Sequence, residues 1–194
     1  MASLVVAGCR ASEGSPPEAT VPTAPSTSST TAPIDVSVIP PVIDEPYLNA
    51  VLAALDEVDG EATRLIYRQK KLTPEAVDLL NAIYSDDQTD RQANIWLQSL
   101  VEDPELSGIL PDPGVRRSQV DTLISASQVC VFVRVRRDYS KVAVDSTPGP
   151  LEYLVLRPLD RSNDPNGRNR TAWMITADGY RDDEAEPSDP CRRT

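Results

Sequence analysis

The stretch VCVFVRVR, residues 129–136, decides the fold class, because valines alternate with other residues along it. Side chains two positions apart lie on the same face of a strand, so these valines share one face. The period of two predicts a β-strand. Three further strands are predicted at residues 119–127, 151–157 and 171–177.

Upstream of the strands, apolar residues recur every three or four positions, which is the spacing of one helical face. The first such run, from Leu48 to Ile66, predicts a long amphipathic helix that is disturbed at Gly60. Helices followed by antiparallel strands indicate the α+β class. We therefore expect three N-terminal helices packed on a four-stranded antiparallel sheet.

The second and third helices are predicted from their start signals. Thr73 is a favourable N-cap residue and Pro74 suits the first helical position, so a second helix is expected from there through Ile83. A third is expected to begin at Thr89, where Gln92 completes a capping-box pattern.

Charge and composition exclude several kinds of function. The chain of 194 residues carries 30 acidic and 19 basic residues, a net charge of −11. A field of this sign repels phosphate backbones, so we expect no nucleic acid among the partners. The chain has no histidine, which excludes Ser-His-Asp and Cys-His catalysis and the usual zinc ligand sets. We expect neither a metal nor a cofactor.

No run of about 18 apolar residues predicts a membrane-spanning helix. However, LVVAGC, residues 4–9, resembles the lipobox of bacterial lipoproteins, which implies that Cys9 is lipidated and becomes the first residue after cleavage. The residues before Cys9 are too few for a signal peptide and include no Lys or Arg, so we expect the true start codon to lie upstream of Met1. The alternative is a chance apolar hexapeptide that ends in cysteine.

A segment rich in Pro, Ser, Thr and Ala follows Cys9 and has almost no aliphatic pattern before Ile34. Such a segment buries too little apolar surface to offset the entropy of ordering, which predicts a disordered linker. A lipidated cysteine before a linker is the arrangement of a surface lipoprotein. We therefore expect an exported protein, anchored to the outer face of the cell membrane by its N-terminal lipid. The alternative, a disordered N-terminus of a cytosolic protein, leaves Cys9 without a role.

The remaining cysteines form an even pair. With Cys9 lipidated, Cys130 and Cys191 remain, and in an oxidising compartment we expect a disulfide that joins the C-terminal tail to a strand. The alternative leaves both as thiols. The expected segments are a truncated signal peptide and lipobox at residues 1–9, a linker at 10–43, a single α+β domain at 44–181 and an acidic tail at 182–194.

The order of elements over residues 45–180 resembles the nuclear-transport-factor-like (cystatin-related) superfamily. In that superfamily a long first helix packs into a strongly curved antiparallel sheet, which implies a cone-shaped domain. Actinobacterial envelope proteins with an anchor and a linker, including accessory proteins of lipid-import systems, are similar in arrangement. The resemblance rests on element order and not on a motif, and the cone hosts isomerases, dehydratases and binding domains, so no single activity follows.

An enzyme of this fold uses carboxylates and tyrosines at the mouth of the cone. The resemblance implies a candidate pocket formed by Tyr67, Asp121, Glu152 and Tyr153, with Arg134 as an anion-binding group. Acid–base catalysis requires such groups to be desolvated and aimed at the substrate. The alternative for each of them is an exposed residue that solvates the surface.

Two other sets of residues have simpler expected roles. Arg136 and Arg137, beside Asp138, predict a solvated strand end with local ion pairs. Trp96 and Trp173 are expected in the hydrophobic core.

Three functions from different classes remain open. The first is a non-catalytic envelope domain that binds a protein partner or a small apolar ligand. The second is an acid–base enzyme acting on a small hydrophobic substrate, which requires a closed pocket with a carboxyl group of raised pKa. The third is a host or phage surface lipoprotein that blocks uptake or infection.

Overall fold

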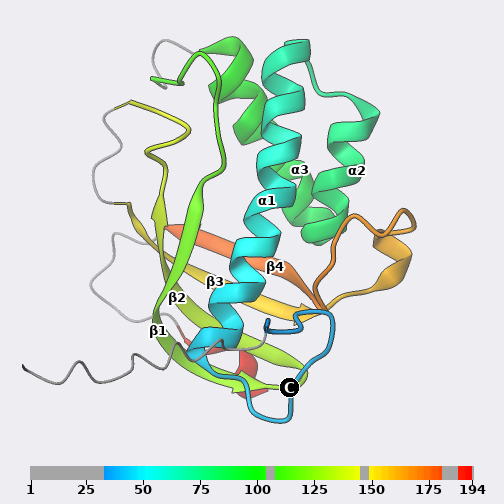
Figure 1. Cartoon of the computed structure of the whole chain (residues 1–194), viewed down its shortest axis with the longest axis vertical. Coiled ribbons are helices and arrows are strands. Elements are labelled where there is room, and N and C mark those ends of the chain that lie inside the picture. The colour runs from blue at the N-terminus through cyan, green and yellow to red at the C-terminus, as the bar shows by residue number, and fades with distance from the viewer. Residues whose placement is uncertain (1–32, 104–107, 145–148, 181–187, 194) are drawn as a thin grey trace, which may run out of the picture. The chain divides into compact units, whose positions relative to one another are not determined.

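The computed structural model describes residues 33–103, 108–144, 149–180 and 188–193. The expected signal peptide with Cys9, and the first part of the expected linker, lie outside the described residues. Within the described part the α+β architecture is confirmed, because three helices precede a four-stranded antiparallel sheet and pack against one face of it (Figure 1).

The first helix, α1 (Glu45–Gln69), begins where the sequence predicts. The side chain of its N-cap, Asp44, accepts the backbone N–H of Tyr47 at 3.0 Å. The helix runs through Gly60 without the disturbance that we expected. A Cβ at Gly60 would lie 2.7 Å from Cγ2 of Val115, so the glycine lets another segment pass close to the helix.

The next two helices differ in how well their starts are predicted. The second, α2 (Pro74–Ile83), has the expected cap, since Oγ1 of Thr73 accepts the N–H of Ala76 at 3.2 Å. The third, α3 (Asp86–Leu97), begins one turn before the expected Thr89 and continues as a π-helical turn, η1 (Gln98–Glu102). The predicted capping box is wrong, because Thr89 and Gln92 are buried side chains inside the helix.

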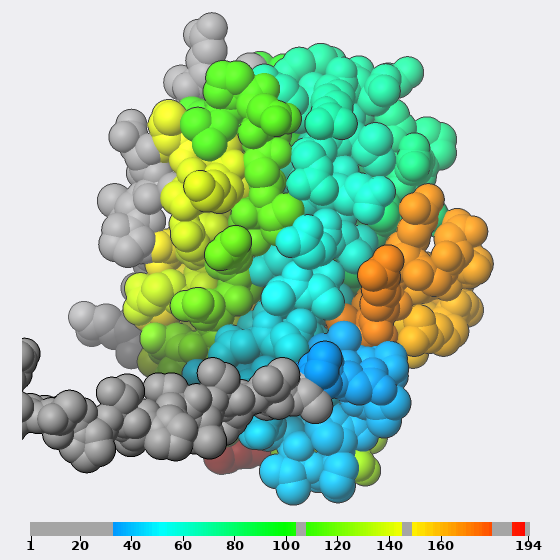
Figure 2. All heavy atoms as spheres, in the orientation of Figure 1, coloured from blue at the N-terminus to red at the C-terminus, as the bar shows by residue number. Residues whose placement is uncertain are grey.

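The last residues of the expected linker, 33–43, belong to the folded unit, which corrects the predicted boundary at residue 44. The carbonyl of Val36 accepts the N–H of Ala172 at 2.9 Å, and the carbonyl of Val38 accepts the hydroxyl of Tyr47 at 3.0 Å. Ile43 is buried in the core. In Figure 2 this blue segment lies against the cyan start of α1 and forms part of the compact surface.

The sheet is an antiparallel meander with the strand order β1-β2-β3-β4. Extra residues shift the register in β1, at Asp121 and Ile124, and in β4, at Thr176, and such bulges bend a strand and increase its twist. The strands are β1 (Arg117–Ser127), β2 (Cys130–Asp138), β3 (Leu151–Pro158) and β4 (Trp173–Tyr180).

The two faces of the sheet have different neighbours. On the inner face, Val131, Val133 and Val135 join the main core with the apolar stripe of α1, and Trp173 is fully buried in the same core, as expected. On the outer face, Cys130 and Phe132 belong to a second, smaller apolar cluster.

The expected disulfide between Cys130 and Cys191 is confirmed. It attaches η3 (Pro190–Arg193) to β2, so the described end of the predicted acidic tail is joined to the domain. Disulfides persist in oxidising compartments, which indicates an extracytoplasmic location. No helix in the described part of the chain has the length and apolar character that a membrane crossing needs.

Candidate functional site

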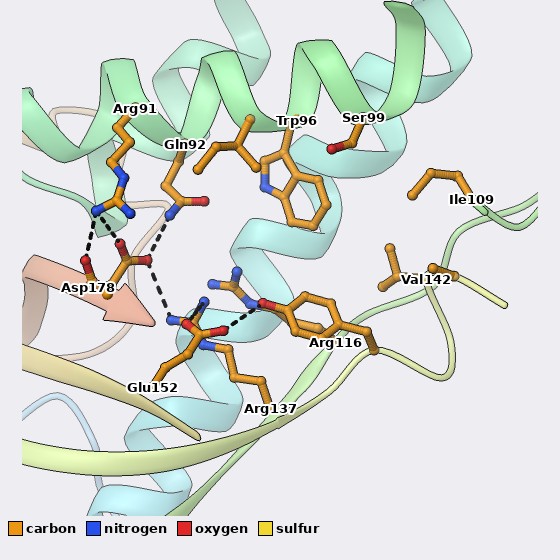
Figure 3. A pocket seen from close by; sticks show the side chains of 14 residues that line it. Arg91, Gln92, Trp96, Ser99, Ile109, Arg116, Arg137, Val142, Glu152 and Asp178 are labelled. Atoms are coloured by element: carbon orange, nitrogen blue, oxygen red, sulfur yellow. Dashed lines mark hydrogen bonds and ion pairs between the residues drawn. The ribbon is translucent and has the colours of Figure 1, made fainter. Parts of the chain in front are cut away.

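A cleft of about 330 Å³ opens between α3 and the ends of the three strands β2, β3 and β4 (Figure 3). Its floor carries charged side chains from the inner face of the sheet, and its upper wall is formed by α3 and η1. The lining residues used below are Arg91, Gln92, Trp96, Ser99, Ile109, Arg116, Arg137, Tyr139, Val142, Glu152 and Asp178.

Strand periodicity places the floor residues. Arg137 continues the alternation of Val131, Val133 and Val135, so its side chain enters the inner face. Glu152 is the register partner of Val135 in β3, and Asp178 is the register partner of Leu154 in β4. Three neighbouring strands thus deliver one arginine and two carboxylates to the same side of the sheet.

Arg137 is the central group of the floor, with 2% of its surface exposed. Its Nη1 lies 3.0 Å from Oε2 of Glu152, and its Nη2 lies 3.7 Å from Oδ2 of Asp178. The second contact exceeds hydrogen-bond distance. No described residue accepts a hydrogen bond from Nε or Nη2 of Arg137.

The two carboxylates of the floor are each held by further donors. The hydroxyl of Tyr139 donates to Oε1 of Glu152 at 3.2 Å. From α3, Nε2 of Gln92 donates to Oδ2 of Asp178 at 2.7 Å, and Nη1 of Arg91 lies 3.4 Å from Oδ1 of Asp178. All four carboxylate oxygens are therefore occupied by donors of the protein itself.

Behind the floor, Arg116 connects the cleft to α1. Its Nε lies 3.3 Å from Oδ1 of Asp56, its Nη1 lies 3.6 Å from Oδ2 of Asp59, and its Nη2 donates to the hydroxyl of Tyr84 at 2.6 Å. Asp59 also accepts the indole N–H of Trp96 at 3.3 Å. The network fixes Trp96 at the edge of the cleft.

Electrostatic interactions keep the two buried guanidinium groups charged. Burial lowers the pKa of Arg116, but Asp59 and Tyr84 outweigh it and raise that pKa well above the ordinary value. For Arg137, burial and Arg116 lower the pKa, while Tyr139 and Glu152 raise it, and the net shift is upward.

Two acidic groups of the same network shift as well. Burial raises the pKa of Tyr84 well above its ordinary value, so the phenol is neutral at neutral pH. Burial also raises the pKa of Asp56, against the opposing charges of Arg116 and Arg137.

The wall opposite the charged floor is apolar. Trp96, Ile109 and Val142 line it, and Ile95 stands at the mouth with 40% of its surface exposed. A ligand in the cleft would therefore meet apolar surface on one side and charged groups on the other.

Of the five residues in the predicted pocket, Glu152 alone lines this cleft. The structure does bring Asp121 and Arg134 together, with Arg134 Nε 2.7 Å from Asp121 Oδ2, but on the outer face of the sheet. Tyr153 lies on that face too, where its ring stacks on Phe132 with centroids 5.7 Å apart. Tyr67 lies near the end of α1, with Nζ of Lys70 3.7 Å from its ring centroid.

Sequence analysis missed most of the residues that build the cleft. Arg137, expected at a solvated strand end, is buried. The alternation of the valines before it could have predicted that its side chain points to the inner face of the sheet. For Asp56 and Asp59 the signal was their position on the apolar face of α1, four residues after Leu52 and Leu55. No pattern in the sequence indicated that Asp178 and Gln92 would meet.

The described residues contain no group of three or more His, Cys, Asp or Glu side chains that could hold a metal ion. Comparisons of the chain with protein-family models, with curated proteins and with solved structures find no match. The case for a function therefore depends on the geometry of the cleft.

Proposed function

We propose that this protein is an extracytoplasmic, lipid-anchored domain that binds a small, mainly apolar ligand in the cleft and does not transform it chemically. The observation that carries the proposal is the cleft of about 330 Å³ with its apolar wall of Trp96, Ile109 and Val142. Its volume falls within the range of small-molecule sites, which is about 300–1,000 Å³.

The state of the carboxylates favours binding over acid–base catalysis. A general base accepts a proton from the substrate, and at Glu152 and Asp178 that proton would have to share each oxygen with a donor of the protein. Asp56 has the raised pKa expected of an acid–base group. However, it accepts the backbone N–H and the hydroxyl of Ser118 and contacts Arg116, which is the role of a structural acceptor.

Location and anchoring are supported by different observations. The disulfide between Cys130 and Cys191 supports export. The lipobox-like hexapeptide that ends at Cys9 supports lipidation. The long first helix packed on a bent antiparallel sheet is in keeping with the cone of the nuclear-transport-factor-like superfamily.

The proposal is tested by titrating ethylbenzene, a small apolar probe, into the full chain carrying Cys9→Ser, which cannot be lipidated. The chain has two tryptophans, so NMR gives two indole N–H signals. Trp96 lines the cleft and Trp173 does not, and Trp96→Phe assigns the signals. We expect the Trp96 signal to shift in a saturable way and the Trp173 signal to stay in place.

A matched pair of variants shows whether the probe occupies the cleft. Ser99→Phe places a ring in the cleft, whereas Gln98→Phe adds the same ring at an exposed neighbouring position that does not line it. We expect Ser99→Phe to abolish the response and Gln98→Phe to retain it. An unresponsive wild-type protein, or a Ser99→Phe variant that binds like the wild type, would overturn the proposal.

A further inference from the structure

We infer that the ligand carries an uncharged carbonyl-type oxygen, which Arg137 binds through Nε and Nη2 at the floor of the cleft. This inference rests on the proposed function, since it specifies which apolar ligands the cleft prefers. It follows from three properties of the floor: where hydrogen-bond donors lack partners, where acceptors are occupied, and how the charges balance.

The donors without partners lie on one edge of a single guanidinium group. Nε and Nη2 of Arg137 are adjacent on the planar fork, whereas Nη1 is engaged by Glu152 at 3.0 Å. Within the described residues neither of the two has a hydrogen-bond acceptor. A buried donor without an acceptor is costly. A hydrogen bond from this edge to a ligand oxygen therefore contributes more binding free energy than a hydrogen bond to an exposed donor would. A carbonyl oxygen has two lone pairs and suits the pair of donors.

The acceptors of the floor, in contrast, have donors already. Glu152 accepts from Arg137 and Tyr139, and Asp178 accepts from Gln92 and contacts Arg91. An ammonium or other donor-only head group would have to share an oxygen with one of these protein donors, and it would leave Nε and Nη2 of Arg137 without an acceptor. The floor therefore favours an acceptor over a donor.

Charge balance distinguishes an uncharged acceptor from an anion. The two buried guanidinium groups, Arg116 and Arg137, face four carboxylates, which belong to Asp56, Asp59, Glu152 and Asp178. Arg91 adds a positive charge only at the mouth, where its side chain is 51% exposed. A carboxylate ligand would bring a further negative charge into a buried site whose arginines are already paired, and such a charge is costly to desolvate. A ketone, ester or amide oxygen avoids this cost.

Four probes of similar size test the inference in the wild-type chain with Cys9→Ser. Ethylbenzene has no head group, acetophenone has the same shape with a carbonyl, benzoate has an anionic acceptor, and benzylamine has a cationic donor. We expect acetophenone to bind about tenfold more tightly than the other three, because a hydrogen bond to a charged partner contributes about a factor of ten or more. Affinities come from the Trp96 indole shift.

The variant Arg137→Lys keeps the positive charge but removes the two-donor edge. We expect it to lose the preference for acetophenone while its affinity for ethylbenzene stays the same. Arg136→Lys is the matched control and should keep the preference, because Arg136 is the next residue of β2, its side chain is 49% exposed and it does not line the cleft. If Arg137→Lys does not fold, the wild-type series still decides.

Each outcome separates the inference from the proposed function. Binding of ethylbenzene without a preference for acetophenone, or tightest binding of benzoate or benzylamine, overturns the inference and leaves the binding function in place. Failure of all four probes to bind overturns both. Loss of ethylbenzene binding in Arg137→Lys would show that the arginine also maintains the shape of the cleft, and the preference measured in the wild-type series would then decide the inference.

Discussion

The carboxylate of Asp56, in the middle of α1, accepts the backbone N–H of Ser118, at the start of β1, at 2.6 Å. It also contacts the buried guanidinium of Arg116. We expect Asp56→Ala to lower the free energy of unfolding by about 3 kcal/mol or more, because breaking a buried ion pair leaves a charge without its partner. Denaturant unfolding followed by circular dichroism measures the loss.

The neighbouring acidic residue on α1 provides the control for Asp56. Glu57 is exposed, and we expect Glu57→Ala to change the unfolding free energy by no more than about 0.5 kcal/mol. Equal stability of the two variants would show that the contact between Asp56 and Ser118 does not hold the helix to the sheet.

Tyr84 makes the stability depend on pH in the alkaline range. Burial raises its pKa well above the ordinary value of 10.0. The stabilisation from keeping this proton is fully present below pH 10 and is lost as the pH rises toward the folded-state pKa. We expect the unfolding free energy to fall steeply above pH 10 in the wild type and less steeply in Tyr84→Phe.

Tyr84→Phe should also cost about 1–3 kcal/mol at neutral pH, because Arg116 loses the hydroxyl that accepts its Nη2 at 2.6 Å. Denaturant unfolding at a series of pH values gives both quantities. A variant with the same alkaline slope as the wild type would contradict the assignment of that slope to Tyr84.

The disulfide should contribute a large share of the stability. Cys130 and Cys191 are 61 residues apart in sequence, and closing a loop of that length restricts the unfolded chain by about 4 kcal/mol. We expect Cys130→Ser and Cys191→Ser each to approach this loss, and dithiothreitol to reproduce it in the wild type. If reduction leaves the unfolding curve unchanged, the bond does not stabilise the domain.

Two N-caps of different quality allow a matched test of capping. Oγ1 of Thr73 accepts the N–H of Ala76 at 3.2 Å, so Thr73→Ala should cost about 1 kcal/mol. Within the described residues Ser85, the N-cap of α3, makes no side-chain capping bond. Ser85→Ala should therefore change the unfolding free energy by less than Thr73→Ala, and the reverse order in thermal denaturation would be inconsistent with these caps.

The parts of the fold that depend on local patterns could be predicted. The apolar stripe from Leu48 to Ile66 gives α1, and the alternating valines give β2, because each pattern needs only the geometry of its own element. The start of α3 could not be predicted in the same way. Thr89 and Gln92 have the spacing of a capping box, but both side chains are buried, and Gln92 donates to Asp178 on a distant strand.

The cleft was harder to predict than the fold, since its groups meet only after the strands have paired. The charge of Arg137 suggested a solvent-exposed side chain. The carboxylates that compensate for its burial, Glu152 and Asp178, come from two other strands. The predicted residues Asp121 and Arg134 do form an ion pair. They lie on the opposite face of the sheet because Arg134 alternates with the inward-facing Val133 and Val135, while Asp121 occupies a bulge in β1.

The bond between Cys130 and Cys191 also orders events in time. Cys191 follows the last strand, β4, in the chain, so the ribosome must synthesise all four strands before the bond can close. A fragment that stops before β4 keeps a thiol at Cys130. An intact bond between Cys130 and Cys191 therefore marks a chain in which all four strands have been synthesised.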